Sequence, residues 1–384
     1  MSTAAGGAEE EERRREGGGL MSEIVFMGSG SSSGNPNLRC VMDPASKCPV
    51  CTHAMANSDS KNRRGNPSLL IRHRGAGRLT TILIDVGKTF KQSAVRWFSK
   101  YNVEQVDAIV LTHEHADAVL GLDDVRELQK IPADWRTAID ALPAMPVKLS
   151  AQCLAYIKNA FPYLVSKPNE GAGQVKRLVS QIDFQVIDAL QDFTLGELTI
   201  KALPLQHGSD CICLGFAFGE RERVVYLSDL SAVLPETMEE LGRRHIHILV
   251  LDSLLSDKDQ TTHIGLPSAV DLAKKLRPSR TLLVGMSHSF GEHDVMNQVS
   301  LSLARALSLG KYFSLSLSLF LFLSLFLVAR VRAFSLSHIY TYIYTHINSL
   351  PYSYSHTHAH AHAVSPSCLS VSQSLWYWYL THAM

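Results

Sequence analysis

Short apolar runs alternate with helix-like stretches between Ser22 and about Asp294. The runs have the length and residue types of buried strands, and the stretches between them carry apolar residues at helical spacing. Strands are expected at Glu23–Met27, Ser68–His73, Thr81–Asp85, Ala108–Thr112, Leu198–Leu205, Val224–Ser228, Ile248–Asp252 and Thr281–Met286. Helices are expected at Phe90–Lys100, Leu122–Gln129, Cys153–Phe161, Pro235–Arg244 and Pro267–Leu276. Strands interspersed with helices favour a layered α/β domain around one core.

Both ends of the chain differ from this region. Residues 1–20 combine a charge run with glycines and have almost nothing to bury, which predicts a disordered leader. After about Val295 the chain repeats Ser-Leu at 314–319 and alternates histidine with alanine or threonine at 356–363, as translated repetitive DNA would. We therefore expect a domain at 21–294 and a low-complexity tail at 295–384 that derives from read-through or a retained intron.

The tail also contains an uncharged run at 312–329 that is just long enough to cross a membrane as a helix. Four serines interrupt it, and its Ser-Leu alternation has a strand-like period, so a cytoplasmic protein is favoured over a membrane-anchored one. The histidine-rich run could bind metal weakly, as such tracts do, but we expect no site there.

Charge and cysteine content limit the functional classes. The formal net charge of +1 on 384 residues gives no global attraction to long nucleic acids or anionic membranes, so an anionic substrate needs a local site. Because the sequence shows no obvious long basic arm, a small or nucleotide-like substrate is expected and no long nucleic acid. Seven cysteines in a chain without an export signal indicate thiols and metal ligands more than disulfides. The oligomeric state stays open, with a homodimer as one option.

The strongest chemical signal is the motif His113-Glu114-His115-Ala116-Asp117, directly after an expected buried strand. Two alternating histidines and an aspartate at a strand end can surround one point, and neutral imidazoles suit Zn²⁺. Ordinary core or surface histidines are the alternative, as in His245-Ile-His247, which lacks a carboxylate at the matching offset. The residue types, their spacing and their position at a strand end favour a metal site.

Other ligand-type residues also follow apolar runs. They are His207, Asp229 and His288. Any one of them alone would more often be structural, because polar residues commonly end strands. Together with the first motif they predict a shared site.

The order HxHxD, His, Asp, His resembles the metallo-β-lactamase superfamily. The resemblance implies a four-layer αββα sandwich, incomplete at its C-terminal end if the tail replaces the genuine terminus. It also implies two divalent cations, zinc or manganese. The ligands would be His113, His115 and His207 for the first cation, Asp229 as a bridge, and Asp117 with His288 for the second.

Two further positions bear on that implied site. Asp85 matches the family's strand-end aspartate that orients a ligand histidine, although a purely structural buried aspartate is the alternative. Ala118 stands where the family usually has another histidine. That departure weakens the second cation site or favours a harder ion such as Mn²⁺.

A second cluster lies near the start of the domain. Cys40, Cys48 and Cys51 have the spacing C-x₇-C-x₂-C, and with His293 as fourth ligand they would form a structural zinc site. Free loop cysteines are the alternative. The cluster resembles the branch of the bacterial phosphoribosyl cyclic phosphodiesterase, which is related to tRNA 3′-processing endonucleases, although its C-x₇-C spacing is longer. Three other cysteines lie in apolar surroundings and are expected to be buried thiols: Cys153, Cys211 and Cys213.

The resemblance implies a phosphodiesterase that attacks small, often cyclic, phosphodiesters with metal-activated water. Asp117 would act at the reacting centre, and His263 would protonate the leaving group, unless His263 is only a polar residue at a helix entrance. Two alternatives remain: a thioester or ester hydrolase of glyoxalase type, and an inactive metal-binding pseudoenzyme or membrane-anchored scaffold.

Overall fold

The computed structural model describes residues 21–75, 77–129, 143–165, 179–296 and 377–378. The expected leader at 1–20, the uncharged run at 312–329 and nearly all of the expected tail lie outside these residues. Among the residues that are described, no helix combines the length and the apolar character that crossing a membrane requires.

The first of two β-sheets contains six strands in sequence order. Strands β1 (Met21–Gly28), β2 (Ser68–Arg74) and β3 (Leu79–Ile84) pair antiparallel. Strands β4 (Ala108–Val110), β5 (Met145–Leu149) and β6 (Ile182–Val186) continue the sheet in parallel. Because β3 and β4 are parallel neighbours, their carboxyl ends bring Asp85 and His113 to the same sheet edge.

The second sheet has the strand order β11-β8-β9-β10-β12-β13-β14, with β7 paired to β8. Its antiparallel part comprises β7 (Asp192–Leu195), β8 (Leu198–His207), β9 (Cys211–Phe218) and β11 (Ala232–Val233). Strands β10 (Val224–Leu227), β12 (Ile248–Asp252) and β13 (Arg280–Val284) are parallel to one another, and β14 (Tyr377–Trp378) pairs antiparallel with β13. His207, Asp229 and Asp252 therefore all lie at carboxyl ends along one edge.

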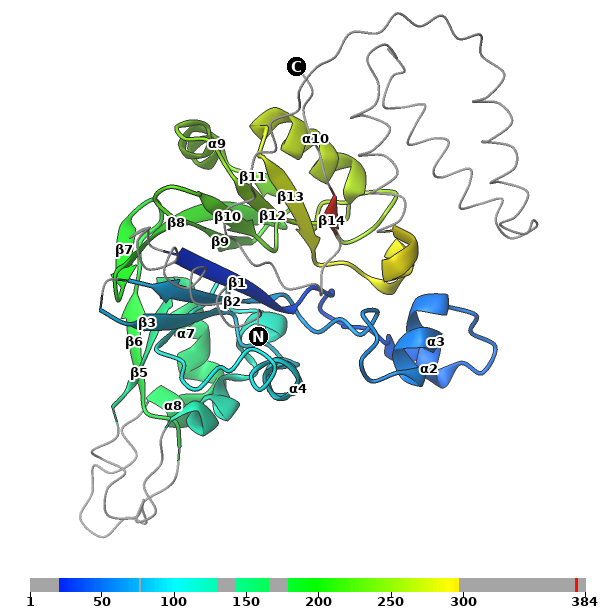
Figure 1. Cartoon of the computed structure of the whole chain (residues 1–384), viewed down its shortest axis with the longest axis horizontal. Helices are drawn as coiled ribbons and strands as arrows, with labels where there is room; N and C mark the ends of the chain where they lie inside the picture. Colours follow the sequence, from blue (N-terminus) through cyan, green and yellow to red (C-terminus); the bar gives the residue numbers. More distant parts are fainter. Residues whose placement is uncertain (1–20, 76, 130–142, 166–178, 297–376, 379–384) are drawn as a thin grey trace, which may run out of the picture. The chain divides into compact units, whose positions relative to one another are not determined.

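Helices cover the outer face of each sheet (Figure 1). The first sheet carries α4 (Phe90–Trp97), the 3₁₀ helix η1 (Leu122–Leu128), α7 (Ala151–Ala160) and α8 (Pro162–Val165). The second carries α9 (Pro235–Gly242) and α10 (Leu266–Leu276). This is the expected four-layer αββα arrangement, and that prediction is confirmed.

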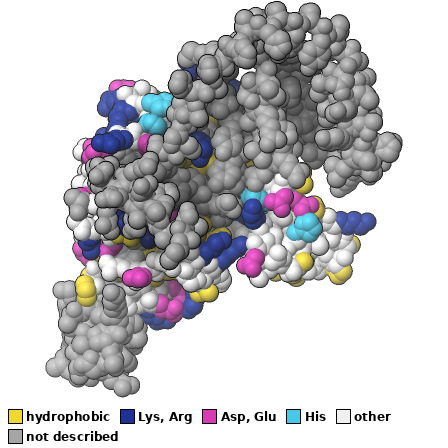
Figure 2. Space-filling view, in the orientation of Figure 1, with side chains coloured by type: hydrophobic (Ala, Val, Ile, Leu, Met, Phe, Trp, Pro, Cys, Tyr) yellow, Lys and Arg dark blue, Asp and Glu magenta, His cyan; other side chains and the backbone are white. Residues whose placement is uncertain are grey.

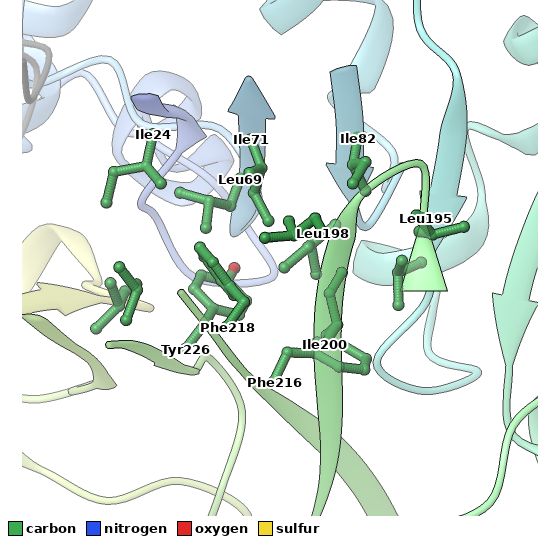
Figure 3. Close-up of a cluster of buried hydrophobic side chains, with 14 of the residues drawn as sticks. Ile24, Leu69, Ile71, Ile82, Leu195, Leu198, Ile200, Phe216, Phe218 and Tyr226 are labelled. Atoms are coloured by element: carbon green, nitrogen blue, oxygen red, sulfur yellow. The ribbon is translucent and has the colours of Figure 1, made fainter. Parts of the chain in front are cut away.

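The two sheets share an apolar core between their inner faces. Ile24 and Ile82 of the first sheet face Phe216 and Tyr226 of the second (Figure 3). The next residue along β1, Val25, packs instead into the outer core beneath the helices. Because alternate side chains of a strand point to opposite faces, a strand buried on both sides must be apolar at every position. That requirement explains the continuous apolar runs in the sequence.

Two points differ from the elements expected from the sequence. The stretch Leu122–Gln129 forms a 3₁₀ helix at Leu122–Leu128, not an α-helix. Several elements were not anticipated: the strands β5, β6, β7, β9, β11 and β14, and the short helices α2 (Leu38–Met42), α3 (Pro49–Ala56), α5 (Ala116–Val119) and α8. Strands β6 and β7 expose many of their residues, so they lack the apolar runs that marked the central strands.

Between β1 and β2 the chain forms a separate excursion with two short helices. Helix α2 (Leu38–Met42) buries none of its residues, whereas α3 (Pro49–Ala56) buries Val50, Cys51 and Ala54. On the face seen in Figure 2 this excursion carries basic, acidic and hydrophobic side chains next to one another. Apolar packing therefore contributes little to the stability of α2. Its Cys40, whose Sγ lies 3.3 Å from His288 Nδ1, connects the helix to the rest of the domain.

The inner core predicts a large difference between two residues of β9. Phe216 is fully buried and packs at right angles to Phe193, with ring centroids 6.4 Å apart, whereas Ile212 is 40% exposed. Phe216→Ala should lower the free energy of unfolding by about 3–5 kcal/mol through lost burial and a residual cavity. Ile212→Ala should cost about 1 kcal/mol or less. Urea unfolding followed by circular dichroism measures both, and equal losses would contradict the assigned sandwich core.

Candidate metal centre and active site

The site begins at the turn that follows β3. Asp85 has a positive φ of 62°, and its carboxylate accepts hydrogen bonds from the backbone N–H and the Oγ1 hydroxyl of Thr112, both at 2.8 Å. Burial raises the pKa of Asp85, and the two hydrogen bonds from Thr112 oppose that rise. Asp85 thus acts on the residue before His113, and through it fixes the start of the HxHxD motif.

This arrangement determines which nitrogen of His113 carries the proton. The Thr112 hydroxyl proton is directed to Asp85, so the Nδ1–H of His113, 2.7 Å away, donates to Thr112 Oγ1. The opposite nitrogen, His113 Nε2, is then a buried acceptor with no hydrogen-bond partner among the described residues. Burial lowers the pKa of His113 to about 4, which keeps the imidazole neutral. A neutral imidazole with a free nitrogen is the form that binds a metal.

Three histidines meet at this point. His115 Nδ1 lies 3.1 Å from His207 Nε2, and the ring of His113 lies 4.6 Å and 5.0 Å from those of His115 and His207. One ligand atom of each lies within 4.8 Å of those of the others. His207 Nδ1 donates to the carbonyl of Thr262 at 2.8 Å, so its Nε2 is also left as an acceptor. The three imidazoles fit a cation, because their ligand atoms lie within 4.8 Å of one another and both His113 Nε2 and His207 Nε2 carry a lone pair.

Asp229 and His263 form a second group with His207. Burial alone would raise the pKa of Asp229, but the imidazoles of His113, His263 and His207 lower it below its ordinary value. His263 Nδ1 lies 2.7 Å from Oδ2 of Asp252, a fully buried carboxylate. Burial alone would lower the pKa of His263, but the Asp252 carboxylate raises it to about 9. His263 can therefore hold a proton at neutral pH.

Asp117 and Ala118 occupy α5 (Ala116–Val119), which directly follows His115. Asp117 is buried. Its negative charge partly opposes the lowering of the His113 pKa by burial and adds to the effect of Asp252 on the His263 pKa, which places Asp117 within electrostatic reach of both groups. Ala118 is buried in the outer apolar core beneath the helices. Asp117 is thus next to the site, while the chain offers no imidazole at 118.

A separate group contains the three N-terminal cysteines together with His288. His288 Nδ1 lies 3.3 Å from Cys40 Sγ and 3.4 Å from Cys48 Sγ, and the four ligand atoms lie within 4.8 Å of one another. Burial raises the pKa of Cys51 to about 12, so a thiolate there needs a compensating cation. Three thiols and one imidazole fit a tetrahedral Zn²⁺ site.

The structure places the two late histidines differently than expected: His288 takes the place expected for His293, and His293 joins none of the ligand groups found among the described residues. His288 was expected with Asp117, but it begins the 3₁₀ turn His288–Phe290 and faces the cysteines. His293 was expected with the cysteines, but it is buried elsewhere, with its backbone N–H on Asn62 Oδ1 at 2.9 Å and its Nδ1 3.2 Å from Asp294. The physical reason is the tight turn after β13, which brings the nearer histidine to the cysteines.

Sequence reasoning missed three residues that act at the site. Asp252 holds His263, Thr112 relays Asp85 to His113, and the Thr262 carbonyl orients His207. Asp252 could have been found, because it ends an apolar strand as Asp229 nearly does. A Cβ at Gly285 would lie 2.1 Å from Asp252 Oδ1, so that glycine is a second signal of a closely packed carboxylate. The other two depend on tertiary contacts.

The other predicted residues have clear locations. Cys153 and Cys213 are buried, the latter with its thiol donating to the Asp229 carbonyl at 2.6 Å. Cys211 is also buried, in the β9 strand opposite His207. His245 lies at the surface, 2.8 Å from Ser279 Oγ.

Comparison with known proteins identifies the fold and the family of this chain. A solved diphosphatase of the PhnP family is 28% identical, with a TM-score of 0.56 over 73% of this chain and 92% of that one. Zn²⁺-bound PqqB from Methylobacterium extorquens has the same fold, with 14% identity and a TM-score of 0.51 over 70% of this chain and 90% of that one.

A curated relative, an octanoyltransferase of Porphyromonas gingivalis, is 28% identical over 265 residues, which are 69% of this chain and 46% of that protein. The chain thus spans about half the length of that relative. The family model for the beta-lactamase superfamily domain matches residues 80–286, which contain the HxHxD motif, His207, Asp229 and His263. The chain belongs to the beta-lactamase superfamily.

Proposed function

We propose that this chain is a metal-dependent phosphodiesterase that hydrolyses small phosphodiesters, cyclic ones included. The observation that carries the proposal is the Asp252–His263 pair, 2.7 Å apart, beside a group of three histidines. An imidazolium fixed next to ligand-type residues suits the protonation of an alkoxide, which is the leaving group of a phosphodiester of an alcohol. The likeness to a diphosphatase at 28% identity supports phosphorus chemistry.

In this proposal His113, His115 and His207 hold one divalent cation, zinc or manganese. A second is held more weakly by Asp229 with Asp117, because Ala118 supplies no ligand and His288 faces the cysteines. When bound, such cations polarise the phosphoryl group and make a water acidic enough to act as a nucleophile near neutral pH. Cys40, Cys48, Cys51 and His288 hold a separate structural Zn²⁺.

The chain's own residues supply the remaining steps. Asp252 keeps His263 protonated and fixes its ring, so that the other nitrogen, Nε2, can give its proton to the departing oxygen. His207 donates a hydrogen bond to the carbonyl of Thr262, the residue before His263. The position of the metal ligand His207 is therefore fixed relative to that of the proton donor His263. A glyoxalase-type thioester hydrolase is the competing enzyme function, but a thiolate leaves without a proton, so it would not need this pair.

Removal of two ligands tests the histidine group. The double variant His113→Ala, His115→Ala should lose about one equivalent of bound metal and at least about 10²-fold in turnover of bis(p-nitrophenyl) phosphate. Metal analysis and nitrophenolate release measure the two effects. His245→Ala, which removes an exposed histidine, should change neither. Unchanged metal content and turnover in the double variant would exclude this group as the metal centre.

A leaving-group comparison tests His263. His263→Asn should slow hydrolysis of uridine 2′,3′-cyclic phosphate, whose leaving group is a ribose alkoxide, by about 10²–10⁴-fold. Hydrolysis of bis(p-nitrophenyl) phosphate should fall far less, because nitrophenolate leaves without a proton. Bound metal should stay at the wild-type level. If metal is lost together with both activities, His263 is a ligand and the proposed proton donor is refuted.

Cysteine variants test the structural zinc. Cys48→Ser should remove about one zinc per chain and lower the melting temperature, because α2 buries no residues of its own and depends on this group. Cys153→Ala, a buried thiol of the outer core, should leave the zinc content unchanged even if it lowers stability. Equal zinc content in Cys48→Ser and the wild type would argue against a metal there.

A further inference from the structure

One loop supplies two features of the proposed active site. Residues 254–264 connect β12 to α10, and they contain both the Thr262 carbonyl that orients His207 and the His263 imidazole. The loop is closed at its base, where Leu254 N–H donates to the Ile264 carbonyl at 2.9 Å and Leu266 N–H donates to Leu255 at 2.8 Å. Because Ile264 follows His263, the position of Leu254 bears directly on the position of the imidazole.

Leu254 is in turn held by the turn that follows β13. The backbone N–H of Ser287 donates to the Leu254 carbonyl at 3.1 Å. The next residue, His288, is the histidine that lies 3.3 Å and 3.4 Å from the thiols of Cys40 and Cys48. One covalent step and one hydrogen bond therefore separate the cysteine group from the loop of the proposed active site.

A buried arginine side chain also holds this turn, from another side. Arg64 is only 3% exposed, and its guanidinium donates to the carbonyls of Ser287 at 3.4 Å and Gly291 at 3.0 Å. The turn is thus held on one side by the cysteine group and on the other by Arg64. Because these contacts restrict its movement, a displacement of the cysteine group would also displace Ser287 and the Leu254 carbonyl bonded to it.

We propose that the group of Cys40, Cys48, Cys51 and His288 positions the 254–264 loop through the Ser287–Leu254 hydrogen bond, and thereby sets the place of His263. In this role the group does more than stabilise α2 and α3 locally. It also fixes the position from which His263 protonates the leaving group. The catalytic part of the inference rests on the proposed phosphodiesterase function. The structural part, order in the loop, does not.

Other contacts limit the size of the effect. Ile264 N–H also donates to the Leu230 carbonyl at 2.9 Å, and Gly265 N–H donates to Asp259 Oδ1 at 2.7 Å. These two hydrogen bonds hold the C-terminal end of the loop without help from Ser287. Loss of the Ser287 link should therefore loosen the loop and reduce proton donation, while the fold and the three-histidine group remain.

Ser287 allows the link to be cut with a matched control. Its φ of −74° suits proline, so Ser287→Pro removes the N–H donor, and the ring Cδ that takes the place of that hydrogen pushes the Leu254 carbonyl away. Ser287→Ala keeps that N–H and loses only the side-chain contact with Ser289 Oγ at 2.7 Å. Both variants leave all four ligands of the cysteine group in place.

The experiment combines amide hydrogen exchange with a leaving-group comparison on the full-length metal-loaded protein. Ser287→Pro should speed exchange of the Leu254 amide by at least about tenfold, while Ser287→Ala stays at the wild-type rate. Ser287→Pro should also slow uridine 2′,3′-cyclic phosphate hydrolysis about tenfold more than bis(p-nitrophenyl) phosphate hydrolysis. That extra loss should vanish in a His263→Asn background, because both changes act on the same proton transfer.

The Cys48→Ala variant gives an independent arm, since it disturbs the group without touching the loop. It should reproduce the faster exchange at Leu254. Unchanged exchange in both Ser287→Pro and Cys48→Ala would overturn the proposal, and so would faster exchange with equal rate losses on the two substrates. If the wild type hydrolyses neither substrate, the proposed function fails, and the exchange data alone decide whether the group orders the loop.

Discussion

The site depends on one constraint: the carboxyl ends of strands from both sheets meet at a single edge, where charged groups are buried. Asp85, Asp229 and Asp252 are all nearly fully enclosed there, and an enclosed carboxylate is costly unless something compensates its charge. Thr112 binds the first, imidazoles surround the second, and His263 pairs with the third. Only a few hydrogen-bond donors and imidazoles compensate these three buried carboxylates. A bound cation would add further positive charge at this edge.

The two groups of ligand-type residues have different chemistry, which matches different tasks. Thiols dominate the group around His288, and thiolates favour a closed tetrahedral zinc site that stabilises local structure. Imidazoles and carboxylates dominate the group around His207, and these leave room for water and substrate. The turn after β13 stands between them, since Ser287 contacts the loop of one group and His288 belongs to the other.

The sequence predicts the central part of this structure and loses accuracy toward its edges. Most strands buried on both faces are marked by continuous apolar runs, although the buried strand β9 was not anticipated, and the HxHxD motif locates two of the three histidines of the group. Exposed strands such as β6 carry no such signal. That His288 and not His293 lies by the cysteines could not be foreseen, because the two histidines are only five residues apart and either could reach the cysteines until the turn is known. Asp252 acts through a contact with His263, eleven residues away, that spacing alone does not reveal.

The most direct test of the two metal centres is a crystal structure of the protein grown with zinc, with anomalous differences measured on both sides of the zinc absorption edge. We expect one zinc peak bounded by His113, His115 and His207, and another bounded by Cys40, Cys48, Cys51 and His288. A peak among the cysteines with His293 as the fourth ligand, or no peak beside His113, would contradict these assignments.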